Sequence, residues 1–94
     1  MPNELLPKWV MKRYLILWDE FGDRKFTFPE ALAILKRSEV RDDDGVVKQV
    51  MSQLRKAGWV EVRLNEKDAR RRDYQLRNYE RIFREITMQS SRRR

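Results

Sequence analysis

The chain has 94 residues, of which 40% are hydrophobic and 39% charged, and its 22 Lys and Arg against 15 Asp and Glu give a net charge of +7. This length allows one domain with a single modest core, and no apolar run approaches the roughly 20 residues of a membrane-spanning helix. Because the sequence has no cysteine and no histidine, it excludes disulfides and thiolate metal sites and lacks the thiol nucleophile and the commonest catalytic base.

The first predicted helix begins after Pro7 and extends to about Phe21. On a helical wheel, one broad apolar face comprises Val10, Met11, Tyr14, Leu15, Leu17, Trp18 and Phe21. Trp9 and Ile16 fall together on the polar side, one heptad apart. We interpret these two residues as a contact with a second subunit, and the alternative is burial under residues 3–6 of the same chain.

A short strand is predicted at Arg24–Phe26, and a second helix follows it. Thr27 and Glu30 have the spacing of a capping box, with a proline in the opening turn. This helix should extend to about Arg37 and bury Ala31, Leu32 and Leu35.

The third helix is expected to start near Asp43 and to end at Gly58, which can adopt the left-handed cap. Its core-facing stripe has the helical spacing i, i+3, i+4, i+7 and consists of Val47, Val50, Met51 and Leu54. Asp42, Asp43 and Asp44 stand where carboxylates complement the first amides and the helix dipole. We prefer this capping role to a metal site, which would need further converging oxygen ligands.

A hairpin and a last helix complete the pattern. Trp59, Glu61 and Arg63 alternate with Val60, Val62 and Leu64, which predicts a half-buried strand, and residues 73–77 supply its partner. The last helix carries a narrow apolar stripe, made of Tyr79, Ile82, Phe83 and Ile86. We expect Ile82 and Ile86 to join Trp9 and Ile16 in a dimer contact.

This order predicts a mainly helical α+β fold, a winged helix-turn-helix with a two- to three-stranded β-wing and a C-terminal helix, in a single domain over residues 1–94. Two segments, Leu54–Val60 and Asp68–Leu76, make residues 27–77 resemble the MarR-like branch of winged-helix transcription regulators. The resemblance implies a homodimer that binds palindromic operators, and such regulators often sense small ligands or oxidants. The chain is shorter than usual for that family, so we expect its large dimerisation domain not to be fully present.

The exposed face of the third helix should offer Lys48, Gln49, Ser52 and Gln53. Gln can bond adenine, Lys can donate to guanine, and Ser can use a base edge or a phosphate. Among these residues the resemblance implies base contacts for Lys48 and Gln49. An ordinary solvated helix face is the alternative.

In the predicted wing, Arg70, Arg71 and Arg72 can reach the DNA backbone or a narrow minor groove. We expect Asp68 and Asp73, which flank them, to fix the tip by local pairing. The resemblance implies an Asp-x-Arg arrangement of this kind for Asp68 and Arg70, so at least one arginine would serve the structure.

Nearly all of the excess positive charge lies in the last third of the chain. Residues 1–62 carry 11 Lys and Arg against 10 Asp and Glu, whereas residues 63–94 carry 11 against 5. This distribution indicates a polyanionic partner.

The sequence therefore predicts a cytoplasmic, sequence-specific regulator that binds double-stranded DNA, with no enzymatic activity, cofactor or metal. Two alternatives stay open: a winged-helix adaptor between proteins, and a non-specific binder of nucleic acid, including RNA.

Overall fold

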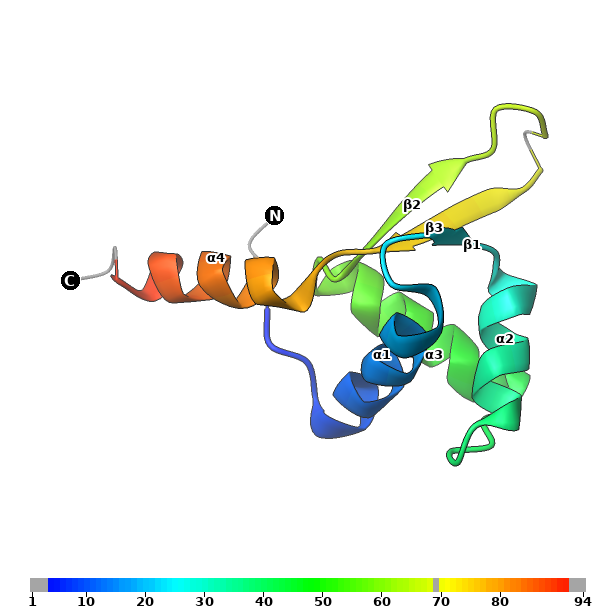
Figure 1. The fold of residues 1–94 in the computed structure, drawn as a ribbon, viewed down its shortest axis with the longest axis horizontal. Helices are drawn as coiled ribbons and strands as arrows, with labels where there is room; N and C mark the ends of the chain where they lie inside the picture. The colour runs from blue at the N-terminus through cyan, green and yellow to red at the C-terminus, as the bar shows by residue number, and fades with distance from the viewer. Residues whose placement is uncertain (1–3, 69, 92–94) are drawn as a thin grey trace.

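Four helices and one three-stranded antiparallel sheet make up residues 4–68 and 70–91, the part of the chain that the computed structural model describes (Figure 1). In chain order they are α1 (Lys8–Phe21), β1 (Lys25–Phe26), α2 (Phe28–Arg37), α3 (Asp44–Lys56), β2 (Val60–Leu64), β3 (Arg72–Leu76) and α4 (Tyr79–Ser91). The predicted mainly helical α+β fold is confirmed, and each element lies close to its predicted bounds. Among the residues that the structure describes, each helix is too short or too polar to span a membrane.

Local signals in the sequence set two of the helix ends. In the capping box of α2, the Thr27 hydroxyl accepts from the Glu30 amide at 3.4 Å, and the Glu30 carboxylate accepts from the Thr27 amide at 3.0 Å. Beyond α3, Gly58 has φ of +81°, the left-handed conformation that a side chain would strain. Both predicted signals are confirmed, and they set the directions in which α2 starts and β2 leaves.

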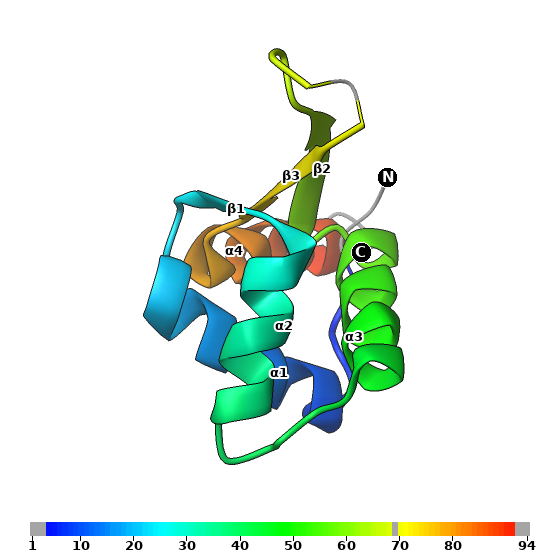
Figure 2. The same cartoon turned by 90° about the vertical axis from the view of Figure 1, so that its right-hand side faces the viewer.

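The sheet has the strand order β1-β3-β2, and the β2–β3 hairpin extends away from the helical body (Figures 1 and 2). Val60 lies opposite Leu76 at its base, and Leu64 lies opposite Arg72 near its tip. The predicted half-buried strand holds only near the base, because Val60 is 5% exposed whereas Leu64 is 64% exposed. Beyond Val62 the hairpin extends past the helical body, so no core element covers its inner face.

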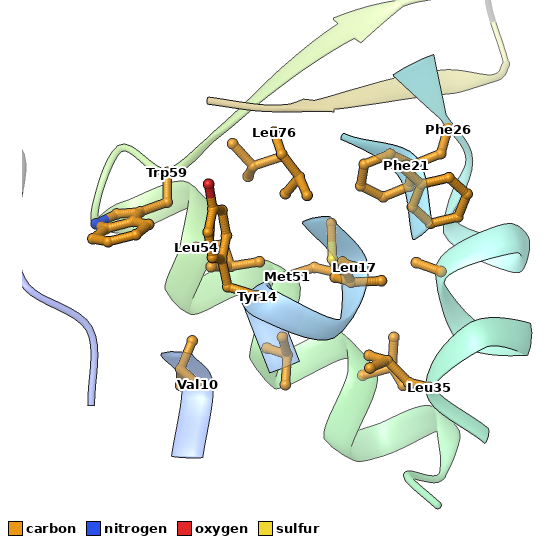
Figure 3. Packing of buried hydrophobic residues seen from close by; sticks show 14 of the residues in the cluster. Val10, Tyr14, Leu17, Phe21, Phe26, Leu35, Met51, Leu54, Trp59 and Leu76 are labelled. Atoms are coloured by element: carbon orange, nitrogen blue, oxygen red, sulfur yellow. The ribbon is translucent and has the colours of Figure 1, made fainter. Parts of the chain in front are cut away.

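The core fills the space between α1, α2, α3 and the sheet (Figure 3). At its centre, Tyr14 meets the ring of Trp59 edge-on at 5.0 Å between centroids, and Phe21 stacks on Phe26 at 4.5 Å. The predicted apolar face of α1 is wrong at Leu15, which is 47% exposed. Leu15 lies at the outer edge of that face, whereas α2 and α3 pack on the side that carries Tyr14.

Arg77 fixes the start of α4 against the rest of the domain. Its carbonyl accepts from the Tyr14 hydroxyl at 2.5 Å, and its guanidinium donates to the Gly58 carbonyl at 2.9 Å. The same guanidinium donates to both carboxylate oxygens of Glu85 at 3.0 Å. The first half of α4 is thereby tied to α1 and to the turn after α3, while its second half projects away from the body (Figure 1).

Candidate nucleic-acid interface

The outer face of α3 carries the polar residues that the sequence predicted there. The stripe Val47, Val50, Met51 and Leu54 is buried. Lys48, Gln49, Ser52 and Gln53 are all exposed. The register of the helix is therefore as predicted, and its polar face is available to a partner.

One flank of this face is turned toward the hairpin. Lys48, Ser52 and Arg55 line a hollow of about 330 Å³, and its remaining lining is Phe28, Met51 and Tyr74. Gln49 follows Lys48 and Gln53 follows Ser52 in the sequence, so the two glutamines point about 100° further round the helix. The polar face thus has a cationic flank beside β3 and an amide flank away from it.

A larger hollow of about 650 Å³ lies between the start of α2 and the hairpin. It is lined by Thr27, Phe28, Pro29, Glu30, Arg70, Arg71, Arg72 and Tyr74. It shares Phe28 and Tyr74 with the hollow beside α3. One surface therefore runs from α3 across β3 to the hairpin tip. We call it the α3–hairpin surface and define it as Lys48, Ser52, Arg55, Arg70, Arg71, Arg72 and Tyr74.

Side-chain hydrogen bonds shape the hairpin tip. The Asp68 carboxylate accepts from the Arg70 amide at 3.0 Å, which confirms that Asp68 fixes the tip, although through the backbone. Asn65, which the sequence analysis missed, accepts from the amides of Lys67 and Asp68 at 2.9 and 3.1 Å. Its amide also donates to the Asp73 carboxylate at 3.0 Å. The signal was present, since Asn commonly bonds the backbone two residues ahead in turns.

The three hairpin arginines have different surroundings. The expectation that Arg70 serves the structure is wrong for its guanidinium, because Asp68 bonds only its backbone amide. Arg71 takes this role instead, since it pairs with Asp73 at 3.6 Å. Within the described part of the chain, the guanidinium groups of Arg55, Arg70 and Arg72 have no hydrogen bond or ion pair. These three groups therefore carry charge that the protein itself does not neutralise.

The three consecutive aspartates at the start of α3 point to three different partners. Asp43 caps the helix, accepting from the Val46 amide at 2.9 Å, as predicted. Asp44 pairs with Lys36 at 3.2 Å. Asp42 is only 5% exposed and makes two bonds of 2.9 Å to the Arg13 guanidinium, a buried pair that the sequence analysis missed. In residues 4–68 and 70–91, no cluster of three acidic side chains suited to a metal ion is found.

The predicted subunit contact needs one correction. Ile82 is fully buried in the core of its own chain, because α4 packs that side against the body, so it is not available to a second copy. Ile16 and Ile86 are half-buried against the same core. Trp9 is 41% exposed.

The alternative for Trp9, burial under residues 3–6, does not hold for the described part of that segment. Residue 3 lies outside the described residues. Glu4 instead bonds to the end of α3: its amide donates to the Ala57 carbonyl at 3.1 Å, and its carbonyl accepts from the Trp59 indole at 2.6 Å. Trp9 contacts the Arg13 guanidinium, 5.7 Å from the ring centroid, and keeps an exposed face.

Comparison of the chain with models of protein families, with curated proteins and with solved structures gives no match.

Proposed function

We propose that this protein is a sequence-specific regulator of transcription that binds double-stranded DNA as a winged helix-turn-helix of the MarR-like kind. In this proposal α3 enters the major groove and the β2–β3 hairpin is the wing, which lies on the backbone or in the adjacent minor groove. The observation that carries it is the α3–hairpin surface, on which the polar face of a helix and three unneutralised guanidinium groups share one side of the molecule.

The residue types on α3 suit base recognition. Lys48 can donate to guanine and Gln49 can bond adenine through two hydrogen bonds, while Ser52 and Gln53 extend the same face. A good pair of this kind is worth about 1–3 kcal/mol of discrimination against the wrong base. The proposed specificity therefore rests on these four side chains, and the proposed affinity rests mainly on the arginines.

The aspartates at the start of α3 do not argue against DNA, because two of them are neutralised within the chain. Asp42 is buried against Arg13, and Asp44 faces Lys36. Asp43 turns its carboxylate back onto the helix amides. A phosphate near the start of α3 would therefore meet less negative charge than three unpaired aspartates would carry.

We further propose that two copies form a homodimer in the cytoplasm, with half-sites about one helical turn apart. Exposed or half-buried apolar side chains on α1 and α4 supply a surface for this contact, among them Trp9, Ile16 and Ile86. Light scattering tests this directly. A dimer at micromolar concentration that Trp9→Ala weakens is the expected result, and a monomer would contradict it.

The decisive experiment selects bound fragments from genomic DNA with the purified protein and then measures affinity at two salt concentrations. We expect a defined inverted repeat whose binding is lost in Lys48→Ala or Gln49→Ala. Lys8→Ala is the matched control, because this exposed lysine begins α1 on the side of the body far from the hairpin tip (Figure 1). Salt-sensitive binding without a preferred site would favour the non-specific binder, and no affinity at low salt would leave the adaptor.

A further inference from the structure

Leu64 is the most exposed large apolar side chain of the hairpin, at 64% exposure. It lies at the end of β2, on the face that carries Val60 and Val62 and that packs on the core nearer the base. A single exposed leucine is ordinary on a protein surface. What distinguishes Leu64 is the set of charges around it.

Three arginines share a hollow with Leu64. Arg72 lies directly across the hairpin, and Arg55 from α3 and Arg63 line the same hollow of about 230 Å³ with Leu64. Arg63 is paired with Glu61 at 3.0 Å. The guanidinium groups of Arg55 and Arg72 have no ion pair within the described residues. Leu64 thus lines a hollow together with two unneutralised cations.

This combination selects the chemistry of the partner. An apolar protein surface that covered Leu64 would also desolvate two unpaired guanidinium groups, which is costly. A nucleic acid offers both complements together, because its phosphates match the guanidinium groups and its sugars present carbon atoms between successive phosphates. Proteins that enter the minor groove commonly place apolar side chains there beside Arg or Lys.

We propose that Leu64 contacts the deoxyribose wall of the minor groove of duplex DNA, while Arg55 and Arg72 hold phosphates on either side of it. This inference rests on the proposed function and adds a residue and a kind of contact to it. Burial of Leu64 supplies a share of the affinity that does not depend on salt, whereas each arginine–phosphate contact releases counterions and gives a salt-dependent share.

A salt titration of DNA binding distinguishes the salt-independent contribution of Leu64 from the salt-dependent contribution of the arginines. The DNA is the duplex recovered by selection, or a mixed-sequence duplex if no site is recovered. Leu64→Ala should weaken binding about 5- to 10-fold at every salt concentration, with an unchanged slope of log affinity against log salt. Arg72→Ala should lower the magnitude of that slope by about 0.9. Leu64→Met, which conserves volume, should restore most of the affinity.

Leu5→Ala is the matched control, since Leu5 is also 64% exposed, precedes α1 and lies outside both the α3–hairpin surface and the proposed dimer contact. Thermal denaturation of each variant checks that the fold is kept. The inference is overturned if the wild type binds and Leu64→Ala binds equally well, or if Leu64→Ala changes only self-association in light scattering. If the wild type binds no duplex even at low salt, the proposed function itself fails, and the Leu64 contact fails with it.

Discussion

The Arg13 guanidinium and the Asp42 carboxylate join α1 to the start of α3, with Nε–Oδ2 and Nη2–Oδ1 distances both 2.9 Å. Asp42 immediately precedes the cap of α3, and Arg13 lies in the middle of α1. Their side chains are only 3% and 16% exposed. The pair therefore fixes the start of α3 on α1, and with it the direction in which α3 presents its polar face.

Asp42→Ala should lower the free energy of unfolding by about 3 kcal/mol, because it leaves the Arg13 charge partly buried without its partner. Asp44→Ala is the control, since Asp44 forms an exposed pair with Lys36 that is worth less than about 1 kcal/mol. Urea denaturation measures both values. Equal, small losses in the two variants would show that the Arg13–Asp42 pair does not hold α3 in place.

Much of the fold was predictable because its signals are local. The capping box of Thr27 and Glu30 and the left-handed Gly58 depend on residues within one turn of the chain, and so do the periodic stripes of the helices. The polar face of α3 followed from its stripe. These signals persist in any context, so the elements appear where the sequence predicted them.

Apart from the local turn bonds of Asn65 and Arg70, the errors concern contacts between distant segments. Arg13 and Asp42 are 29 positions apart, and no pattern in either segment indicates that they meet. The burial of Ile82 and the exposure of Leu64 depend on where the helical body ends relative to α4 and the hairpin. Periodicity identifies the side of an element that is apolar, but it does not indicate how far the covering layer extends.

Tyr14→Phe should destabilise the protein and also remove a pH dependence. The Tyr14 hydroxyl donates to the Arg77 carbonyl, and burial raises the pKa of Tyr14 well above its ordinary value. Loss of the bond should cost about 1 kcal/mol near pH 7. Because the folded-state pKa is raised, the stability linked to Tyr14 is complete below the unfolded pKa of about 10 and falls as pH rises above it.

The measurement is urea denaturation of wild type and Tyr14→Phe between pH 7 and 11. The difference in stability between them should shrink as pH rises above about 10, since only the wild type must keep this phenol protonated. Titration of other groups cancels in the difference. A constant difference over the whole range would contradict the raised pKa of Tyr14.

Alanine substitutions at Gly45, within α3, and at Gly58, just after it, should change the stability of the protein in opposite directions. Gly58→Ala places a side chain at φ of +81° and should cost about 1–2 kcal/mol. Gly45 lies in the first turn of α3, where an added Cβ would meet the Asp43 carboxylate at an ordinary contact distance of 3.5 Å. Gly45→Ala should therefore stabilise the protein by about 0.5–1 kcal/mol. Thermal denaturation shows the sign of each. Stabilisation by Gly58→Ala would mean that α3 ends differently.

The three hairpin arginines should contribute unequally to binding if the proposed function is right. Arg70 and Arg72 are unneutralised, so alanine at either position should lower the magnitude of the salt slope by about 0.9. Arg71 already pairs with Asp73, so it must give up that partner to bind a phosphate, and Arg71→Ala should change the slope less. Fluorescence anisotropy of a labelled duplex at several salt concentrations measures all three slopes.

The double variant Arg71→Ala with Asp73→Ala separates the two roles of Arg71. If Arg71 only holds the tip, removing both partners should leave the salt slope close to that of the wild type, while affinity falls slightly because Asn65 also loses the Asp73 carboxylate. If the magnitude of the salt slope instead falls by about 0.9 in the double variant, as for the loss of one phosphate contact, Arg71 binds DNA directly. Equal slopes for all three single variants would likewise reject the division of roles and leave only the summed charge of the hairpin as the source of affinity.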